Sequence, residues 1–434
     1  MIFTSTRGKS PAVAISTAIA NGIAPDGGLY VPASWPAIDL DALATCTTLP
    51  DIGLPSLRPF FSGDALEAEL GPIVSEAFDF PAPVTALKGA AEPAFVLELF
   101  HGPTAAFKDF GARFLAACMG RQRKSGARPL TILVATSGDT GGAAAAAFHR
   151  RPGIDVVVLF PRGLVSKRQQ QQLTCWGGNV QAVVVRGTFD DCQRLVKEAF
   201  RDPELARTHD LSSANSINIG RLLPQIVYYA AASLDIRRRC GQAASFIVPS
   251  GNLGNSMGCV WARRLGFPID EIVLAHNANR TVPEFLATGE YRPRPSIATL
   301  ASAMDVGDPS NMERLRAFEP DWTRLRSEVS AFSVTDEEIR AQIARDYVRY
   351  GRIWCPHTAT AARVYDQLVG DRRRKAWVLV ATAHPAKFDE IVEPLIGRSV
   401  DVPAALARLL ELPSSSVEIG PELAELRTLL TRGR

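Results

Sequence analysis

The chain has 434 residues, of which 46% are hydrophobic and 21% charged, and its net charge is only +3. This length is more than one hydrophobic core normally accommodates and indicates two or three domains, while the composition is ordinary for a soluble globular protein. The balanced charge, without a basic stripe interleaved with aromatic residues, argues against a nucleic-acid partner. The lack of any uninterrupted run of about 18 apolar residues argues against a membrane span.

The seven cysteines indicate the compartment. They are scattered and odd in number, and no two have the Cys-x-x-Cys spacing. This pattern disfavours a disulfide framework and a structural zinc site and is typical of a reducing cytosol. None of the six histidines lies in a metal-ligand spacing, and the first 25 residues lack the long apolar core of a signal peptide. We therefore expect a cytoplasmic protein without a bound metal.

The first 85 residues differ from the remainder of the chain. They are rich in proline and glycine, and their hydrophobic periodicity is weak. This predicts a separate helical and loop-rich N-terminal unit over residues 1–85.

From about residue 86 onward, short apolar runs alternate with helical patterns. The runs are nearly continuous, as is typical of strands buried on both faces, and they cover residues 95–99, 130–135, 154–160, 180–185, 246–248, 272–275 and 377–381. Helical patterns follow at 107–119, 142–149, 189–200, 220–239 and 254–265. This order predicts an α/β fold with mainly parallel sheets, and residues 400–434 form a terminal helical segment.

The loop after the run at 246–248 has the composition of a phosphate site. It reads Ser250-Gly-Asn-Leu-Gly-Asn255 and precedes a helical pattern. Glycines let the backbone approach an anion, and a helix N-terminus offers unpaired N–H groups and the positive end of the helix dipole. A plain strand-to-helix turn is the alternative, but two glycines and two asparagines so close together favour a phosphate cradle.

A second loop follows the run at 130–135 and reads Thr136-Ser-Gly-Asp-Thr-Gly-Gly142. Hydroxyl and N–H groups at the start of another helix suit a carboxylate or a phosphate. The loop has neither the Gly-x-Gly-x-x-Gly pattern nor a Walker pattern, which argues against a nucleotide-binding enzyme. A Ser/Thr-rich helix cap would have the same composition.

A third loop, residues 101–109, carries a lysine in an unusual setting. Lys108 stands near the start of a helical pattern, between Phe107 and Phe110. Desolvation and the helix dipole both lower the pKa of such a lysine, as a Schiff-base lysine requires. The alternative is a lysine whose ammonium group reaches solvent past its aromatic neighbours.

A fourth loop, residues 382–388, follows the run at 377–381. Ligands bind outside the carboxyl ends of the strands in an open α/β sheet, so we expect the four loops to converge on one site. The hydroxyl of Thr382 could there hydrogen-bond a ring nitrogen without giving it a full charge.

These four segments resemble those of the threonine synthases. Residues 101–111 are similar to the family's cofactor-lysine segment, 136–141 to its substrate-carboxylate loop and 249–255 to its cofactor-phosphate loop. Residues 382–388 resemble the segment whose threonine faces the pyridine nitrogen. Shorter matches at 26–32, 213–218 and 303–306 extend the resemblance, in the family's order, over nearly the whole chain.

The resemblance implies a fold of the tryptophan-synthase-β-like type with pyridoxal 5'-phosphate as cofactor. It implies two open, mainly parallel-sheet α/β domains beside the N-terminal unit. The large, cofactor-binding domain would cover residues 86–118 and 215–434, and the small domain, with the substrate-carboxylate loop, residues 119–214. The implied lyase reaction converts O-phospho-L-homoserine and water to L-threonine and phosphate by β,γ-replacement. The oligomeric state stays open.

The resemblance also implies roles for individual residues. Lys108 would hold the cofactor as a Schiff base and act as the catalytic proton shuttle. The cofactor would further contact Gly251, Asn252, Leu253, Asn255 and, at the ring nitrogen, Thr382. The substrate carboxylate would bind Ser137, Gly138, Asp139 and Thr140. Because the charge of Asp139 would repel a carboxylate, we expect its backbone N–H to act while its side chain turns away.

The leaving phosphate needs cations of its own. Basic and hydroxyl residues after the run at 154–160, together with one lysine of the fourth loop, are the candidates: Arg162, Ser166, Lys167, Arg168 and Lys387. Exposed basic residues in a loop are solvated by default, so each of them has an ordinary surface role as its alternative.

Other functions remain open at this point. A serine or threonine dehydratase of the same fold would share Lys108 and the phosphate cradle but would not need a site for a dianionic leaving group. A threonine-synthase-like phospho-lyase that makes no threonine is a closer variant. A non-catalytic ligand-binding protein of this fold is disfavoured by the presence of Lys108.

Overall fold

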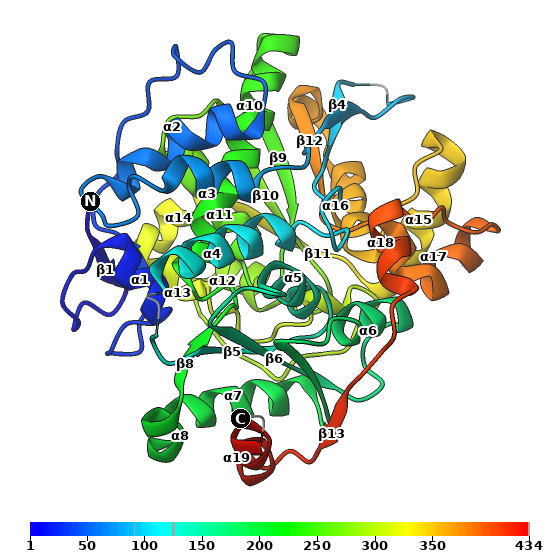
Figure 1. The fold of residues 1–434 in the computed structure, drawn as a ribbon. Helices are drawn as coiled ribbons and strands as arrows, with labels where there is room; N and C mark the ends of the chain where they lie inside the picture. Colours follow the sequence, from blue (N-terminus) through cyan, green and yellow to red (C-terminus); the bar gives the residue numbers. More distant parts are fainter. Residues whose placement is uncertain (91, 124–125, 433–434) are drawn as a thin grey trace.

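The computed structural model describes residues 1–90, 92–123 and 126–432 and contains two large sheets, one in the upper and one in the lower part of Figure 1. The larger sheet has six strands in the order β11-β10-β9-β12-β4-β3. Their bounds are β3 (Val84–Ala86), β4 (Ala94–Glu98), β9 (Ala244–Pro249), β10 (Ile269–His276), β11 (Ser330–Ser333) and β12 (Ala376–Ala381). Strand β3 is antiparallel to β4, and the other pairs are parallel.

The smaller sheet has five strands in the order β13-β7-β6-β5-β8, and all its pairs are parallel. Its strands are β5 (Leu130–Ala135), β6 (Ile154–Pro161), β7 (Val180–Val185), β8 (Asp210–Ser213) and β13 (Val417–Ile419). A short antiparallel pair, β1 (Phe3–Ser5) and β2 (Tyr30–Pro32), lies near the N-terminus. The expected α/β fold with mainly parallel sheets is confirmed.

Helices cover both faces of the larger sheet because successive residues of its strands point to opposite sides. In β9, Phe246 and Val248 face one apolar core, and Ile247 faces another. The first core includes α4 (Lys108–Gln122), α10 (Ile226–Cys240) and α11 (Gly254–Arg264), and the second includes α15 (Asp336–Tyr350), α16 (Pro356–Gln367) and α17 (Asp389–Ile396). The remaining helices on this side of the molecule are α9 (Ile219–Leu222), α12 (Thr281–Thr288), α13 (Met312–Phe318) and α14 (Trp322–Glu328).

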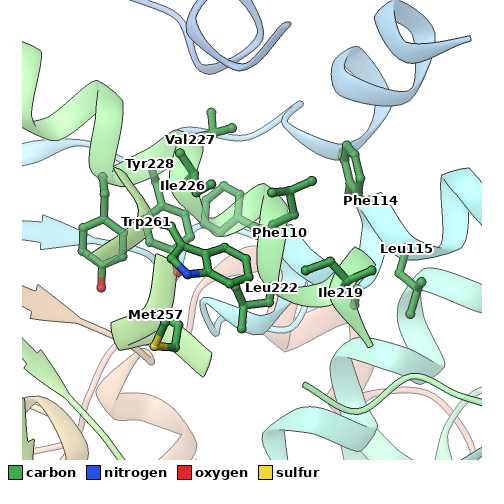
Figure 2. Packing of buried hydrophobic residues seen from close by; sticks show 14 of the residues in the cluster. Phe110, Phe114, Leu115, Ile219, Leu222, Ile226, Val227, Tyr228, Met257 and Trp261 are labelled. Carbon is green, nitrogen blue, oxygen red and sulfur yellow. The ribbon is translucent and has the colours of Figure 1, made fainter. Parts of the chain in front are cut away.

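Helix α4 lies between the two sheets. One continuous apolar core contains its buried residues, Val134 and Val158 of the smaller sheet, and Phe246 and Val248 of the larger one. Figure 2 shows side chains of α4, α9, α10 and α11 meeting in this core: Phe110, Phe114, Leu115, Leu222, Ile226, Tyr228, Met257 and Trp261. The N-terminal helices α1 (Ile15–Asn21), α2 (Leu49–Phe61) and α3 (Leu70–Ala77) extend the same core.

The smaller sheet is covered by α5 (Asp139–Phe148) and α6 (Lys167–Thr174), and on its other face by α7 (Phe189–Arg201) and α19 (Leu423–Arg432). The short helices α8 (Pro203–Thr208) and α18 (Ala404–Leu410) pack against α7 and α6. Four 3-10 turns complete the fold: η1 (Leu223–Gln225), η2 (Ser302–Met304), η3 (Gly370–Arg374) and η4 (Pro385–Phe388). None of the described helices combines the length and the apolar character needed to cross a membrane.

The helix expected over residues 220–239 is divided. Helix α9 ends at Leu222, η1 follows with Pro224 in its first turn, and α10 begins at Ile226. Proline has no backbone N–H and cannot continue an α-helical hydrogen-bond ladder, which explains the break. The consequence is that Arg221 lies in a short, separate helix rather than inside a long one.

The expected domain limits stay a prediction, but strand pairing corrects them in one place. Strand β13 pairs with β7, with Val417 opposite Val183, so residues 417–419 join the smaller sheet although we expected the whole of 215–434 in the large domain. The chain after α17 runs along α6, where the Gln171 side chain donates to the carbonyl of Leu412 at 2.6 Å and the Ser415 N–H to that of Thr174 at 2.8 Å. These contacts direct the C-terminal segment to the smaller sheet.

Helix α4 has no room for a side chain at Gly111. A Cβ there would collide with the backbone carbonyl oxygen of Arg221, whereas one at Gly120, in the same helix, would be 3.5 Å from the flexible end of Arg151. We expect Gly111→Ala to destabilise the protein by about 1–3 kcal/mol through overpacking. Gly120→Ala should leave stability unchanged or raise it by up to about 1 kcal/mol. Urea unfolding midpoints test this, and equal midpoints for the two variants would contradict it.

Candidate active site

A cavity that is partly open to solvent lies at the carboxyl ends of β5, β9 and β12. Its wall contains residues of all four loops that we expected to converge: Lys108, Ser137, Asp139, Thr140, the run 249–256 and Thr382. Strands β9 and β12 are parallel neighbours, so their following loops lie at one edge of the larger sheet, and the loop after β5 of the smaller sheet completes the cavity wall.

Lys108 is the first residue of α4 and is held by a junction between two loops. The Phe107 N–H donates to the Thr382 carbonyl at 2.8 Å, and the His384 N–H to the Ala105 carbonyl at 3.0 Å. Ala105 has a left-handed backbone with φ 54°, a strained conformation for a residue with a side chain. Enclosure by protein lowers the pKa of Lys108 to about 8, because an ammonium group loses hydration there. A lysine amine that loses its proton near neutral pH is suited to bond a carbonyl group.

The loop of residues 250–255 is a cradle of unpaired donors. The N–H groups of Gly251, Asn252, Leu253 and Asn255 have no backbone acceptor in the described part of the chain. Leu253 has a left-handed φ of 61°, and α11 starts at the next residue, so its positive end lies at this loop. A Cβ on Gly251 would lie 2.6 Å from the Met304 Cα, which shows that only glycine fits there.

Asn255 supplies a further donor beside this cradle. Its Oδ1 accepts hydrogen bonds from Tyr228 at 2.6 Å and Tyr229 at 2.9 Å. Its Nδ2 is buried and has no hydrogen-bond partner among the described residues. A buried unpaired donor is costly, so this group fits a ligand oxygen. Cradle and amide together fit the phosphate of pyridoxal phosphate.

The loop of residues 136–142 is closed by Thr136, whose Oγ1 accepts from the N–H groups of Gly138 at 3.0 Å and Gly141 at 2.8 Å. Ser137, Asp139 and Thr140 line the cavity at the start of α5. Gly138 does not line it, because it is packed against the Gln169 side chain.

The side chain of Asp139 is held by a lysine and a glutamine. Its Oδ1 lies 2.7 Å from Lys387 Nζ and accepts from Gln169 Nε2 at 3.0 Å. The residue is only 4% exposed yet borders the cavity. Burial by itself would raise the pKa of Asp139, but Lys387 and Lys108 together hold it below its ordinary value. Asp139 is therefore an ionised carboxylate whose charge is balanced by a lysine.

Thr382 also lies where the sequence indicates. It is buried at the end of β12 and borders the cavity, and its carbonyl accepts from Phe107. Its N–H donates to Thr358 Oγ1 at 3.3 Å, while its own Oγ1 has no hydrogen bond within the described residues. The hydroxyl is thus free for a ligand.

The structure does not bring the expected ligands of the leaving phosphate to the cavity wall. Their side chains are engaged elsewhere: Arg162 with Glu418, Ser166 at the N-cap of α6, Lys167 with Glu390, Arg168 with Asp389 and Lys387 with Asp139. The segment after β6 packs onto η4 and α17, because Ser166 donates to the Lys387 carbonyl and Arg168 to that of Ala386. This docking carries the basic residues away from the opening.

Arg221 and Ser216 are polar cavity residues that the sequence did not indicate as site residues. Arg221 is 3% exposed, donates to the Ala214 carbonyl and forms no ion pair among the described residues, and its Nε has no partner. Ser216 Oγ accepts from Asn252 Nδ2 at 2.8 Å and from Asn311 Nδ2 at 3.2 Å, so its own proton is free to be donated. The short match at 213–218 was the available signal, but the apparent helix over 220–239 hid Arg221.

A buried histidine that also borders the cavity carries no charge. His357 Nε2 accepts from the Ala303 N–H at 3.0 Å, and its Nδ1 has no protein partner. Burial lowers the pKa of His357 to about 4, so the ring is neutral near pH 7. The positive groups at the cavity are therefore Lys108, Arg221 and the N-termini of α4, α5 and α11, an arrangement that attracts anions.

Three family models match the chain in succession. Residues 2–78 match the threonine synthase N terminus, residues 80–383 the pyridoxal-phosphate dependent enzymes, and residues 358–430 the C-terminal region of threonine synthase. The chain belongs to the threonine synthase family. A curated threonine synthase of Haemophilus influenzae is 40% identical over 428 residues, with 97% of each chain covered.

Solved structures support the same relationship. The threonine synthase of Escherichia coli is 36% identical with a TM-score of 0.92, and 100% of each chain is covered. The PLP-bound threonine synthase of Brucella melitensis is 36% identical with a TM-score of 0.90, covering 100% of this chain and 99% of that one. The protein is accordingly a pyridoxal-phosphate-dependent lyase of threonine biosynthesis that acts on a small molecule.

The close approach of Gly251 to Met304 makes a specific prediction. Gly251→Ala should weaken binding of pyridoxal phosphate about 5- to 150-fold, because overpacking by about 1–3 kcal/mol must displace the cradle. The matched control is Gly142→Ala, where a Cβ would make an ordinary 3.6 Å contact with Gln172. Titration of the cofactor absorbance measures both affinities. Equal affinities in the two variants would show that the cradle tolerates a side chain.

Proposed function

We propose that this chain converts O-phospho-L-homoserine and water to L-threonine and phosphate in the cavity around Lys108, and that it does so in the cytoplasm. The observation that carries the proposal is a second set of anion donors, Ser216 and Arg221, beside the cradle at 250–255. One phosphate belongs to the cofactor, so a second set of donors fits a phosphorylated substrate. The seven free cysteines support the location, since they suit a reducing compartment.

The cofactor contacts follow from the cradle. We assign the cofactor phosphate to the N–H groups of Gly251, Asn252, Leu253 and Asn255, and the ring nitrogen to the free hydroxyl of Thr382. When bound, pyridoxal phosphate withdraws electrons from the substrate carbons next to the amine. A neutral hydroxyl at the ring nitrogen leaves that nitrogen without a full positive charge.

Lys108 has two roles in this assignment. Its amine would hold the cofactor in the resting enzyme, and as the first residue of α4 it keeps a fixed place in the cavity wall. Its pKa of about 8 lets the amine accept a proton from the substrate Cα and return it at pH values near neutrality. Catalysis thus needs no further base at Cα.

The substrate carboxylate is assigned to the start of α5. Ser137 and Thr140 border the cavity with their hydroxyls, and the helix N-terminus adds the positive end of its dipole. Asp139 does not repel the carboxylate in this arrangement, because Lys387 cancels its charge.

The leaving phosphate is assigned to Ser216 and Arg221 in place of the residues after β6. A buried guanidinium without a carboxylate partner is costly and is stabilised by an anionic ligand. The Ser216 hydroxyl is oriented by two amide donors and can only donate to that anion. A dehydratase of the same fold would have no use for such a site, so this observation favours phosphate release.

The activity itself is tested by supplying O-phospho-L-homoserine to the purified holoenzyme. We expect phosphate and threonine to form in equal amounts, and no ammonia to form from threonine in a parallel assay. Phosphate without threonine would identify a different phospho-lyase, and ammonia from threonine would identify a dehydratase.

The assignment of the leaving phosphate is tested by Ser216→Ala against Arg162→Gln. Loss of a hydrogen bond to a charged group costs about 1.5–3 kcal/mol, so Ser216→Ala should lower kcat/KM for phosphohomoserine about 10- to 100-fold. Arg162→Gln should change it less than twofold, because that side chain is 66% exposed and pairs with Glu418. Cofactor absorbance should stay the same in both. The reverse order of effects would restore Arg162 as the ligand.

A further inference from the structure

Lys387 forms a buried ion pair to which the proposed function assigns no part in proton transfer. Its side chain is completely buried, with Nζ 2.7 Å from Asp139 Oδ1 and 2.8 Å from the Thr104 carbonyl. Burying two opposite charges costs several kcal/mol per ion, and apolar residues of similar volume would often be as stable. A buried pair at the edge of a reactive cavity is therefore a candidate for a role in the chemistry.

The two oxygens of the Asp139 carboxylate differ in their contacts with the described residues. Its Oδ1 takes both protein contacts, from Lys387 and from Gln169, while its Oδ2 has no hydrogen bond within the described residues. Asp139 and Lys108 both border the cavity. One oxygen of the carboxylate is thus held by the protein, and Asp139 stands in the same cavity wall as Lys108.

Charged groups on neighbouring elements change how readily the Lys108 amine is protonated. Asp139 of α5 favours its protonated form, whereas Arg221 of α9 and Lys387 of η4 disfavour it. His357 of α16 is coupled to the same charges but is neutral near pH 7, and Asp109 of α4 is occupied by two hydrogen bonds from Thr104. Asp139 is therefore the carboxylate that opposes the positive groups at Lys108.

We propose that Asp139 and Lys387 act together as positioning residues that set the pH at which the Lys108 amine loses its proton. Lys387 keeps Asp139 ionised and fixes one of its oxygens, and Asp139 partly balances the positive charge around Lys108. The pair is neutral as a whole, so a substrate carboxylate can bind at the start of α5 without repulsion. The inference deepens the proposed function, because it rests on Lys108 as the proton-transferring group.

Substitution of Asp139 and substitution of Lys387 must shift the pKa of the Lys108 amine in opposite directions. Asp139→Asn leaves Lys387 and Arg221 unopposed, so the Lys108 amine should lose its proton at a pH lower by about one unit. Lys387→Met leaves the charge of Asp139 uncompensated, so the amine should keep its proton to a pH higher by about one unit. The double variant removes both charges and should titrate within about 0.3 unit of the wild type.

One measurement is the pH dependence of the cofactor absorbance in the holoenzyme, which follows the proton on the Lys108 nitrogen while it is bonded to the cofactor and should shift in the same directions. A second one is the pH dependence of acylation of Lys108 in the full chain freed of cofactor, followed by mass spectrometry of the peptide that contains it. Lys375→Met is the matched control, since Lys375 Nζ lies 2.9 Å from Asp270 at the amino ends of the strands, the end opposite the cavity. This control should titrate like the wild type.

The proposal is supported if the titration pH of Lys108 shifts down in Asp139→Asn, up in Lys387→Met, and not at all in the double variant. The proposal is overturned if the titration pH shifts in the same direction in both single variants, or does not shift. It is also overturned if the double variant titrates like either single variant. If Lys387→Met does not fold, Asp139→Asn and the double variant decide between these outcomes. The proposed function has a separate test. It is wrong if the wild-type enzyme forms no threonine, whatever the result of the titrations.

Discussion

Helix α4 is packed by apolar side chains of the smaller sheet and α5. It is also packed by those of α9, α10 and α11 (Figure 2), and this burial decides where Lys108 lies. The helix cannot shift toward α9, because Gly111 already touches the backbone of Arg221. The turn before it is held by Asp109, which accepts from the Thr104 N–H at 2.8 Å and from its hydroxyl at 2.6 Å. A reactive amine on the first residue of such a helix has a defined position, which proton transfer at one carbon atom requires.

A buried arginine connects the N-terminal unit to the cavity residue Ser216. Arg314 is fully buried and has only neutral acceptors: the carbonyls of Tyr30, Ser216 and Ile217 and the side chain of Asn311. Asn311 in turn donates to Ser216, so the N-terminal unit is connected through Arg314 to the proposed phosphate site. This connection gives the first 85 residues, which carry none of the proposed site residues, a place in the architecture of the cavity.

The central strands were predictable because they are long, nearly continuous apolar runs, and β5 and β7 have the expected bounds. The strands that were not anticipated, such as β8, β11 and β13, are short and lie at sheet edges, where half-exposed residues give no clear hydrophobic signal. The same contrast holds at the site. Gly-rich loops after buried strands were recognisable, but nothing local to residues 162–168 shows that α6 docks on η4, or that Arg221 is a buried cation.

The amino-acid sequence by itself determined the α/β class, the four loops and the family, because buried strands, helix starts and the lysine segment are local patterns. Tertiary structure decided which charges meet. Lys387 reaches Asp139 across 248 positions of the chain, and Arg221 borders the cavity because Pro224 interrupts a helix and Gly111 admits its backbone. The pKa and the anion affinity of a group depend on burial and on charges within a few ångströms. Those distances are set by packing between segments far apart in sequence, which no local pattern contains.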